Sequence, residues 1–465
     1  MKNEPVILEL GPDFYDACRP ASFPQAELRW FHSEAARNVQ LESLSSGQIK
    51  NHFWAFQGFE GNLNQTLALR YHGHQFRHYN PDLGDGRGFL LAQFRGLDGK
   101  LHDLNTKGSG TTPYSRSGDG RLTLKGAVRE LLATEMLEFL GVNTSQTFCI
   151  FETGESLERQ DEPSPARGAV LTRRMHSSLR FGTFQRHAYF EQADNLRKLT
   201  EHALENYYPE VTDSNGASPG AQLFQAVCHR TAHLAAQLMM AGFVHGVLNT
   251  DNMNISGEVF DFGPFRFMGP YEPSCTAAYF DAQSLYCYGR QPESFLWGLE
   301  QLGQALKGAY PDLQLEPVLE DFPREFQSAL LRIFLKRLNL KSIDLKHDLS
   351  LFQAFFQFLE DGSLFFERTL FDFHSGFARE AWKSSPHASQ YQSTAGQNFL
   401  SRLKGFEPLD ESRARHPYFQ QNRPETLLIH EIEALWQTIA LANNWQMLQS
   451  KIARLRSYRG AYSPL

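Results

Sequence analysis

The sequence is poor in cysteine and lacks a long apolar run, a cluster of basic residues and an internal repeat. Its five cysteines show no Cys-x-x-Cys spacing, which argues against a disulfide framework or a zinc knuckle. No apolar stretch reaches the roughly 18 residues that a membrane-spanning helix needs. The start, MKNEPVILELG, has the pattern of neither a signal peptide nor an organelle presequence. We therefore expect a soluble, cytoplasmic protein that has no membrane partner.

The charge balance excludes another class of partner. The formal net charge is −7, and no run of Lys or Arg is present. Nucleic-acid-binding domains usually carry a basic patch or stripe, so nucleic acid is not an expected partner. The hydrophobic share of 41%, with 38 Phe, is enough for a large core. A chain of 465 residues exceeds the usual size of one domain, which predicts two lobes.

One stretch is similar to the catalytic part of a protein kinase. Kinases carry His-Arg-Asp, then an Asn, and later Asp-Phe-Gly; the first Asp accepts a proton, whereas the Asn and the second Asp hold metal ions. The stretch HGVLNTDNMNISGEVFDFGPF, residues 245–265, keeps the Asn as Asn252 and the second Asp as Asp261. Val247 stands at the position of the first Asp. The base that a kinase would use is therefore missing.

The residues between Asn252 and Asp261 predict a hairpin, with strands at 253–255 and 258–260. Such a hairpin would aim both side chains at one ion. Amide and carboxylate oxygens suit Mg²⁺ or Mn²⁺ beside the phosphates of a nucleotide. The alternative is a plain hairpin followed by a chance Asp-Phe-Gly, but the combined spacing favours the metal site.

Lys107 and Glu130 extend the kinase pattern. In kinases a strand Lys binds phosphates and pairs with a Glu on the following helix. Lys107 ends a predicted strand, 101–107, which pairs with a strand at 88–94, and Glu130 lies in a predicted helix, 123–140. The alternative is that both side chains are solvated, because Lys and Glu are usually exposed. Under either interpretation we expect the Lys107 side chain to lie at a solvent-exposed end of its strand.

Two arginines and two glycine-rich loops are further candidates for phosphate binding. Arg173 and Arg180 add positive charge, but a surface basic patch explains them equally well. The first loop, 84–88, lacks the G-x-G-x-x-G spacing and is more typical of a turn. The second loop, 107–121, follows the Lys, where ordinary kinases have none.

The order of the elements predicts the fold class. Short strands and one helix precede residue 170, whereas a helix at 223–240 and a mainly helical pattern from residue 292 follow it. We therefore expect an α+β, protein-kinase-like, bilobal fold. Residues 1–170 would form an N-terminal region and a mixed lobe, and residues 171–465 a mainly helical lobe that carries the metal-binding and catalytic motifs.

These motifs together resemble the selenoprotein O family, a group of pseudokinases. The matching pieces, in the family's order, are YHGHQF (71–76), LGDGRGFLL (83–91), KGSGTTPYSRSGDGR (107–121), RELLATEML (129–137), RFGTF (180–184) and HGVLNTDNM with FDFGPFRFM (245–268). They cover roughly the first 300 residues, and the long loop motifs are highly specific.

The resemblance implies protein adenylylation. The family binds ATP in a flipped orientation and transfers AMP to hydroxyl groups of protein substrates, which implies Ser, Thr or Tyr acceptors, ATP as co-substrate, and Mg²⁺ or Mn²⁺. The site residues that it implies are Lys107, Arg173 and Arg180 for the phosphates, Glu130 to orient Lys107, Gly84, Gly86, Arg87, Asp119 and Gly120 along the nucleotide, Asn252 and Asp261 for the metal, and Asp251 as the proton acceptor.

Two alternatives stay open, and one feature of the family is missing. Transfer of another nucleotide, such as UMP, would use the same metal and phosphate groups. An inactive nucleotide-binding scaffold would explain Val247 and the irregular glycine loop. Many family members carry a Cys or selenocysteine near the C-terminus that is associated with redox control, whereas no Cys follows Cys287 here. The resemblance therefore does not extend to redox control through the tail.

Overall fold

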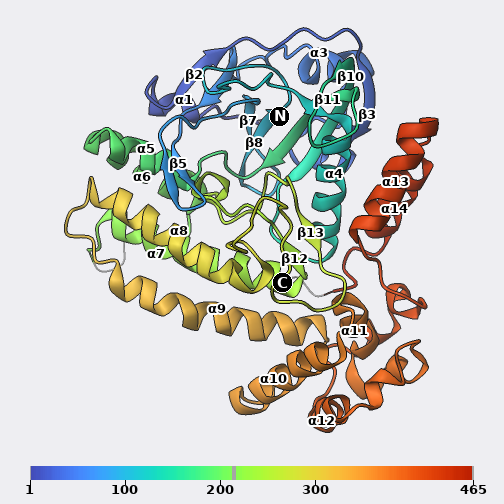
Figure 1. Ribbon diagram of the computed structural model, residues 1–465. Helices are drawn as coiled ribbons and strands as arrows, with labels where there is room; N and C mark the ends of the chain where they lie inside the picture. The colour runs from blue at the N-terminus through green and yellow to red at the C-terminus, as the bar shows by residue number, and fades with distance from the viewer. Residues whose placement is uncertain (1, 212–215, 463–465) are drawn as a thin grey trace.

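The computed structural model describes residues 2–211 and 216–462 and shows a mixed α/β protein with one large antiparallel sheet (Figure 1). Within the described residues the main path of this sheet is β2-β4-β7-β8-β11-β10-β3, with β1 paired to β7 and β9 to β11. The strands are β1 (Lys2–Asn3), β2 (Tyr15–Cys18), β3 (Glu27–Phe31), β4 (Thr66–Leu69), β7 (Leu90–Arg95), β8 (Leu101–Lys107), β9 (Leu122–Thr123), β10 (Gln146–Leu157) and β11 (Ala166–Met175). Two small ribbons accompany it: β5 (Gly73–Gln75) with β6 (His78–Asn80), and β12 (Phe243–Val244) with β13 (Arg266–Phe267).

In the view of Figure 1 most helices lie below this sheet, and those within residues 345–403 lie farthest from it. The early helices are α1 (Ile7–Leu10), α2 (Ser33–Asn38), α3 (Ser46–Phe53), α4 (Leu124–Phe139), α5 (Phe181–Tyr189), α6 (Ala193–Tyr207) and α7 (Pro219–Met240). The later helices are α8 (Gln291–Lys307), α9 (Glu316–Arg337), α10 (Leu345–Gly362), α11 (Phe366–Phe373), α12 (Thr394–Leu403), α13 (Ile429–Ala442) and α14 (Gln446–Ser457). The prediction of a mainly helical pattern after residue 292 is confirmed.

Strands β7 and β8 confirm the predicted pair that ends at Lys107. They run antiparallel, and Gly99 in the connecting turn adopts a positive φ of 75°. Both strands lie in the middle of the sheet, so every residue of β8 is buried. The central position of β8 therefore brings its polar residues, Lys107 among them, into the interior.

Helix α4 also matches its prediction. Thr123 caps its N-terminus by accepting a hydrogen bond from Gly126 N at 3.1 Å, and such a cap satisfies a backbone donor that the helix leaves unpaired. Its apolar residues are buried against β10 and β11. The chain leaves the helix through Gly141, whose φ of +80° suits the end of a helix. Helices α13 and α14 return from the far end of the sequence and contact α4 (Figure 1).

The hairpin predicted at 253–255 and 258–260 is wrong. The two segments do form a turn, but each makes its backbone hydrogen bonds to a different part of the chain. Ile255 N donates to Leu179 O, and Val259 N donates to Asn143 O. Because these neighbours occupy the backbone groups, the segments form only isolated bridges and no paired strands.

Among the helices of the described ranges, none is both long enough and apolar enough to cross a membrane.

Candidate active site

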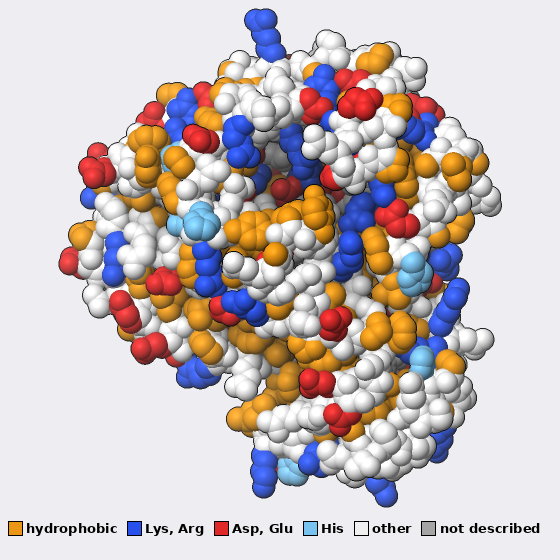
Figure 2. Space-filling model, in the orientation of Figure 1, with side chains coloured by type: hydrophobic (Ala, Val, Ile, Leu, Met, Phe, Trp, Pro, Cys, Tyr) orange, Lys and Arg blue, Asp and Glu red, His pale blue; other side chains and the backbone are white. Residues whose placement is uncertain are grey.

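The residues predicted for phosphate, nucleotide and metal binding gather around one cleft of about 690 Å³. The first glycine loop, the end of β8, the second glycine loop, β11 and the segment 247–261 all contribute to its walls. Figure 2 shows a hollow that contains basic and acidic side chains in the upper half of the view. Every predicted site residue lines this cleft except Glu130, which lies behind Lys107. Its volume falls within the range of ordinary ligand sites.

Lys107 and Glu130 form a buried ion pair, with 2.7 Å between Lys107 Nζ and Glu130 Oε2. Lys107 is only 4% exposed and Glu130 only 1%. The expectation of an exposed strand-end Lys is therefore wrong, because β8 lies in the middle of the sheet. The same Nζ lies 2.5 Å from Asp261 Oδ1, so Lys107 joins α4 to the segment that carries Asp-Phe-Gly.

Asp261 lies at the centre of a cluster of cations. Arg173 Nη2 donates a hydrogen bond of 3.3 Å to Asp261 Oδ1, and Arg173 Nε lies 3.5 Å from Glu130. Burial alone would raise the pKa of the Asp261 carboxyl, but the charges of Lys107 and Arg173 outweigh burial and hold this pKa well below its usual value. Asp261 also has a φ of +62°, an uncommon conformation for a residue other than glycine. Asp261 is thus a charged carboxylate held in a strained backbone.

Arg180 holds the opposite wall of the cleft. It donates hydrogen bonds of 3.0 Å to Asp85 Oδ1 and to the backbone oxygen of Asp251. Its guanidinium also lies 4.4 Å from the centre of the Tyr71 ring. Burial raises the pKa of Asp85 in spite of the Arg180 charge. Arg180 therefore connects the first glycine loop to the segment that carries Asp251.

Asp251 lies on a short 3-10 turn, Thr250–Asn252, that is fixed from several sides. Thr250 Oγ1 accepts a hydrogen bond from His74 N at 2.7 Å, and Asn249 Oδ1 accepts one from Phe76 N at 3.0 Å. One carboxylate oxygen of Asp251, Oδ1, is buried and finds no hydrogen-bond partner among the described residues. Burial raises the pKa of Asp251 to about 6, against the opposing charge of Arg180. Such a carboxylate accepts a proton more readily than an exposed one.

His245 and Val247 occupy the His position and the catalytic Asp position of the kinase-like motif. Val247 lines the cleft at the position of the kinase base, and it has no group that can accept a proton. His245 Nε2 lies 3.0 Å from Phe260 O, and Val247 N donates to His245 Nδ1. Burial lowers the pKa of His245, so this imidazole stays neutral. His245 therefore supports the backbone and takes no proton from a substrate.

Asn252 and Asp261 are suited to hold a divalent cation. Asn252 Nδ2 donates to Val247 O at 2.9 Å, which leaves the amide oxygen as the free end of the side chain. Asp261 offers a second hard oxygen with full negative charge. An amide oxygen and a carboxylate oxygen, completed by phosphate oxygens and water, are the donor set that Mg²⁺ or Mn²⁺ prefers. The donor chemistry of both side chains fits the predicted metal.

The glycines of the two loops are required by contacts between the loops themselves. A Cβ on Gly84 would lie 2.3 Å from the Tyr114 ring, and one on Gly86 would lie 3.0 Å from Tyr114 O. A Cβ on Gly120 would lie 2.3 Å from the backbone of Gly110. Asp119 turns toward Arg159 at the rim, with 2.9 Å between their charged atoms. The first loop is therefore more than a turn, because the second loop packs directly onto it.

A larger cavity of about 840 Å³ lies elsewhere and contains none of the predicted site residues. Strand β11 separates the two sites: Arg173 lines the cleft, whereas the next residue, Arg174, lines the larger cavity. The cations of the larger cavity are mostly paired, for example Arg230 with Glu210 and Arg459 with Glu138. The smaller cleft is therefore the candidate active site.

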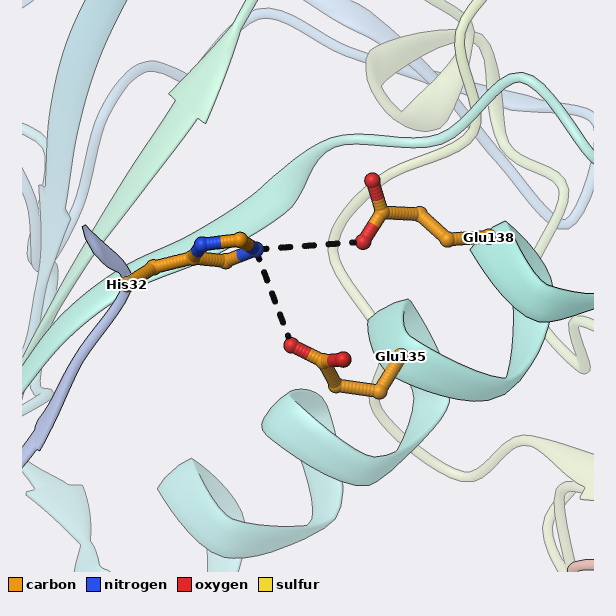
Figure 3. Close-up of side chains that lie close together, drawn as sticks. All are labelled: His32, Glu135 and Glu138. Carbon is orange, nitrogen blue, oxygen red and sulfur yellow. Dashed lines mark ion pairs between the residues drawn. The ribbon is translucent and has the colours of Figure 1, made fainter. Parts of the chain in front are cut away.

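A second cluster with metal-ligand residues, His32, Glu135 and Glu138, lies on the outer side of α4 (Figure 3). His32 Nε2 lies 3.7 Å from Glu135 and 3.9 Å from Glu138. Because His32 Nδ1 accepts a hydrogen bond from Ala35 N, the proton of the neutral ring resides on Nε2. A protonated Nε2 cannot ligate a metal, and Arg456 and Arg459 already neutralise the two carboxylates. This cluster is an ion-pair network.

Sequence reasoning missed Asp85 and Tyr71, which hold Arg180 in place. Asp85 lies between the two glycines of the first loop, and Tyr71 begins the YHGHQF motif. The only signal for Asp85 was its place inside a glycine-rich stretch. Its partner, Arg180, comes 95 positions later, so only the folded chain brings the two together.

Comparisons with known proteins identify the family of this chain. A family model described as protein adenylyltransferase SelO matches residues 1–456. A protein of Synechocystis sp., named protein nucleotidyltransferase YdiU, is 41% identical over 471 residues, which cover 98% of each chain. A protein of the same name from Gloeobacter violaceus is 41% identical over 464 residues, covering 97% of this chain and 94% of its own. A third, from Trichormus variabilis, is 38% identical over 472 residues. The chain therefore belongs to the SelO family of protein adenylyltransferases and is an enzyme, a nucleotidyltransferase that acts on proteins with a nucleotide as co-substrate.

Proposed function

We propose that this enzyme transfers AMP from ATP to a Ser, Thr or Tyr hydroxyl of a protein substrate and releases pyrophosphate, with Mg²⁺ or Mn²⁺ bound in the cleft. The observation that carries the proposal is the buried Asp251 carboxylate, whose Oδ1 is without a partner in the described structure, in the same cleft as Lys107, Arg173 and Arg180. A kinase would place its base two residues after the His, where this chain has Val247. The proposed proton acceptor, Asp251, lies at a different position in the chain from the base of a kinase. This difference suits attack on the α-phosphorus of ATP, whereas a kinase directs attack on the γ-phosphorus.

The reaction exchanges one bond at phosphorus and moves one proton. The hydroxyl oxygen forms a bond to the α-phosphorus while the bond from that phosphorus to the bridging oxygen of the β-phosphate breaks. The bonding electrons leave with pyrophosphate, and the hydroxyl proton passes to the Asp251 carboxylate. Lys107 and Arg173 offset the negative charge that develops on the leaving group.

The free enzyme already holds these cations in place through carboxylates. Lys107 and Arg173 both contact Asp261 and Glu130. Nucleotide phosphates offer oxygens of the same charge, so they compete with Asp261 for these N–H donors. Asp261 and Asn252 would hold the metal ion, which would supply positive charge to neutralise the phosphates. Glu130 keeps Lys107 oriented throughout.

The proposal includes a kinase-like arrangement of two lobes. The mixed lobe comprises residues 1–170 and supplies Lys107 and Glu130, and the mainly helical lobe supplies Asp251, Asn252 and Asp261. The contact between Lys107 and Asp261 supports this arrangement, because it joins β8 to the segment that ends in Asp-Phe-Gly. The glycine loops, with Gly84, Gly86, Arg87, Asp119 and Gly120, would line the nucleotide.

ATP labelled at either the α- or the γ-phosphate tests which phosphorus is attacked. The purified protein is incubated with each label, Mg²⁺ or Mn²⁺, and a mixture of synthetic peptides that carry Ser, Thr and Tyr. We expect the peptides to retain the α label and the γ label to appear in pyrophosphate. Retention of the γ label together with release of ADP would show an ordinary kinase and overturn the proposal.

UMP transfer is the second candidate, because the relatives are named only as nucleotidyltransferases. The same assay with α-labelled UTP, alone and in competition with ATP, compares the two nucleotides directly. Preferential incorporation from ATP supports adenylylation. Preferential incorporation from UTP in the presence of Mn²⁺ replaces it with uridylylation at the same site.

A further inference from the structure

The positive side chains that line the cleft fall into two groups. Those that already have carboxylate partners are Lys107 with Glu130 and Asp261, Arg173 with the same two residues, Arg180 with Asp85, Arg121 with Glu155, and Arg159 with Asp119. Within the described ranges, Arg87 and Arg116 line the cleft without such a partner. The family resemblance accounts for Arg87 but not for Arg116.

The loop that carries Arg116 is held by its neighbours. Ser115 Oγ donates to Gly86 O at 2.5 Å, and Gly118 N donates to Ser115 O at 2.7 Å. Tyr114 donates its hydroxyl proton to Asp16. The Arg116 side chain is exposed and makes no hydrogen bond or ion pair with the described residues. Its charge is therefore not needed to hold the loop.

The backbone at Arg116 also points to a role in the site. Its φ is +53°, in the left-handed region that residues other than glycine adopt rarely. Such conformations cluster at ligand-binding and active sites, where the surrounding structure enforces them. Here Tyr114 and Ser115 are fixed on one side and Gly118 on the other, so the loop presents a long cationic side chain at the mouth of the cleft.

The two unpaired arginines act on different carboxyl groups of the cleft. The positive charge of Arg116 lowers the pKa of Asp251, although burial has the larger and opposite effect on that pKa. The charge of Arg87, in contrast, acts on Asp261. Arg116 thus lines the same cleft as Asp251 and is close enough for their charges to interact, and Asp251 is the proposed proton acceptor, where the hydroxyl must meet the α-phosphorus.

We propose that Arg116 is a further catalytic residue, whose guanidinium binds a non-bridging oxygen of the α-phosphate while the hydroxyl attacks. The inference rests on the proposed function. In phosphoryl transfer the charge is spread over the non-bridging oxygens of the reacting phosphorus, and an arginine near them stabilises the transition state. A guanidinium is a better partner for these oxygens than an ammonium because its donors form a planar fork. Arg116 donates hydrogen bonds and transfers no proton.

The test compares Arg116→Gln and Arg116→Lys with wild type, using α-labelled ATP and the same synthetic peptide mixture. Arg77→Gln is the matched control, since Arg77 is an exposed arginine that pairs with Glu293 and does not line the cleft. We expect Arg116→Gln to lower kcat by about 10²-fold or more, as removal of one transition-state donor typically does. Arg116→Lys should recover part of this loss. Thermal stability and the Kd for a non-hydrolysable ATP analogue should stay close to those of wild type.

A sulfur substitution locates the contact. The two diastereomers of ATP with sulfur at one non-bridging α position are compared in wild type and in Arg116→Gln. We expect one diastereomer to be a poor substrate for wild type, and the difference between the two to shrink in the variant. An unchanged ratio, or a variant that raises only the KM for peptide, would overturn the inference. If wild type itself transfers no α label, the proposed function fails first; normal transfer by Arg116→Gln overturns this inference alone.

Discussion

At the scale of single residues, Asp261 carries the charge on which both Lys107 and Arg173 depend. We expect Asp261→Ala to abolish the dependence of ATP binding on Mg²⁺, because the variant loses the only carboxylate assigned to the metal. Calorimetric titration of ATP with and without Mg²⁺ measures the effect. Asp312→Ala, at an exposed acidic residue outside the cleft lining, is the control. If Asp261→Ala binds ATP with Mg²⁺ as tightly as wild type, the metal assignment is wrong.

We expect the Lys107 side chain to contribute both to nucleotide transfer and to the stability of the folded protein. We expect Lys107→Met to reduce nucleotide transfer strongly and also to lower the free energy of unfolding, because Glu130 is left buried with only Arg173 nearby. Removal of one partner from a buried pair costs up to roughly 3–5 kcal/mol. Urea denaturation measures this loss.

The double variant Lys107→Met with Glu130→Gln separates the two roles of Lys107. It should regain much of the stability, since no unpaired charge remains, but not the activity. A single variant as stable as wild type would show that the buried pair contributes little.

Asp251 tests the chemical step without disturbing nucleotide binding. We expect Asp251→Asn to slow AMP transfer by roughly 10²–10⁴-fold, the usual effect of losing a general base. The Kd for ATP should change little, because Arg180 contacts the backbone oxygen of residue 251 and not its carboxylate. Steady-state kinetics and calorimetry on the same preparation give both numbers. Transfer at the wild-type rate would assign the proton to another acceptor.

At the scale of elements, the two glycine loops act as one unit because they pack on each other. We expect Gly84→Ala to weaken ATP binding and to destabilise the protein by roughly 1–3 kcal/mol, as overpacking does. The new methyl group would lie 2.3 Å from the Tyr114 ring, which Asp16 holds through its hydroxyl. Gly405→Ala is the matched control, since the nearest atom there is 3.7 Å away. Equal ATP affinities for the two variants would mean that the loops move independently.

Elements with local signals could be predicted from the sequence, and those with distant partners could not. Helix α4 shows its apolar spacing, its Thr123 cap and its terminal glycine within one stretch. The segment from 253 to 260 reads as a hairpin in isolation, but its hydrogen bonds go to residues near 143 and 179. The burial of Lys107 follows from the position of β8 in the sheet, which no local pattern encodes.

The same distinction applies to the site. Asn252 and Asp261 could be found because their spacing lies within one short motif, and the long loop motifs identified the family. Asp85 could not, because its partner Arg180 lies 95 positions later, at the start of α5. A residue whose partner lies about a hundred positions away carries no pattern that a single sequence can reveal.

At the scale of the whole molecule, α4 is held on both sides. Its inner side presents Glu130 to Lys107, and its outer side presents Glu135 and Glu138 to Arg456 and Arg459 of the C-terminal segment. Glu135 is only 1% exposed. We therefore expect the position of this helix, and of Glu130 beside Lys107, to depend on residues near the end of the sequence.

A double-mutant cycle on this contact tests that dependence. We expect Arg456→Met to destabilise the protein and to lower the rate of AMP transfer, although Arg456 lies outside the cleft lining. Combined with Glu135→Gln, the cycle should give a coupling energy of about 0.5–3 kcal/mol, as for other residues in contact. Arg402→Met, at an exposed arginine on α12, should change neither stability nor rate. A coupling energy near zero would leave α4 independent of the C-terminal helices.

The contact between Glu135 and Arg456 also bears on synthesis at the ribosome. Arg456 follows Glu135 by 321 positions, and domains generally fold as the chain emerges, N-terminal part first. Until Arg456 has been translated, the Glu135 carboxylate on α4 lacks this cation, so we expect the helix to pack against the sheet with less than its full stability. We therefore expect nascent chains to complete the binding cleft only near the end of translation, and a chain that stops before Arg456 to transfer nucleotide poorly even though every residue that lines the cleft has been made.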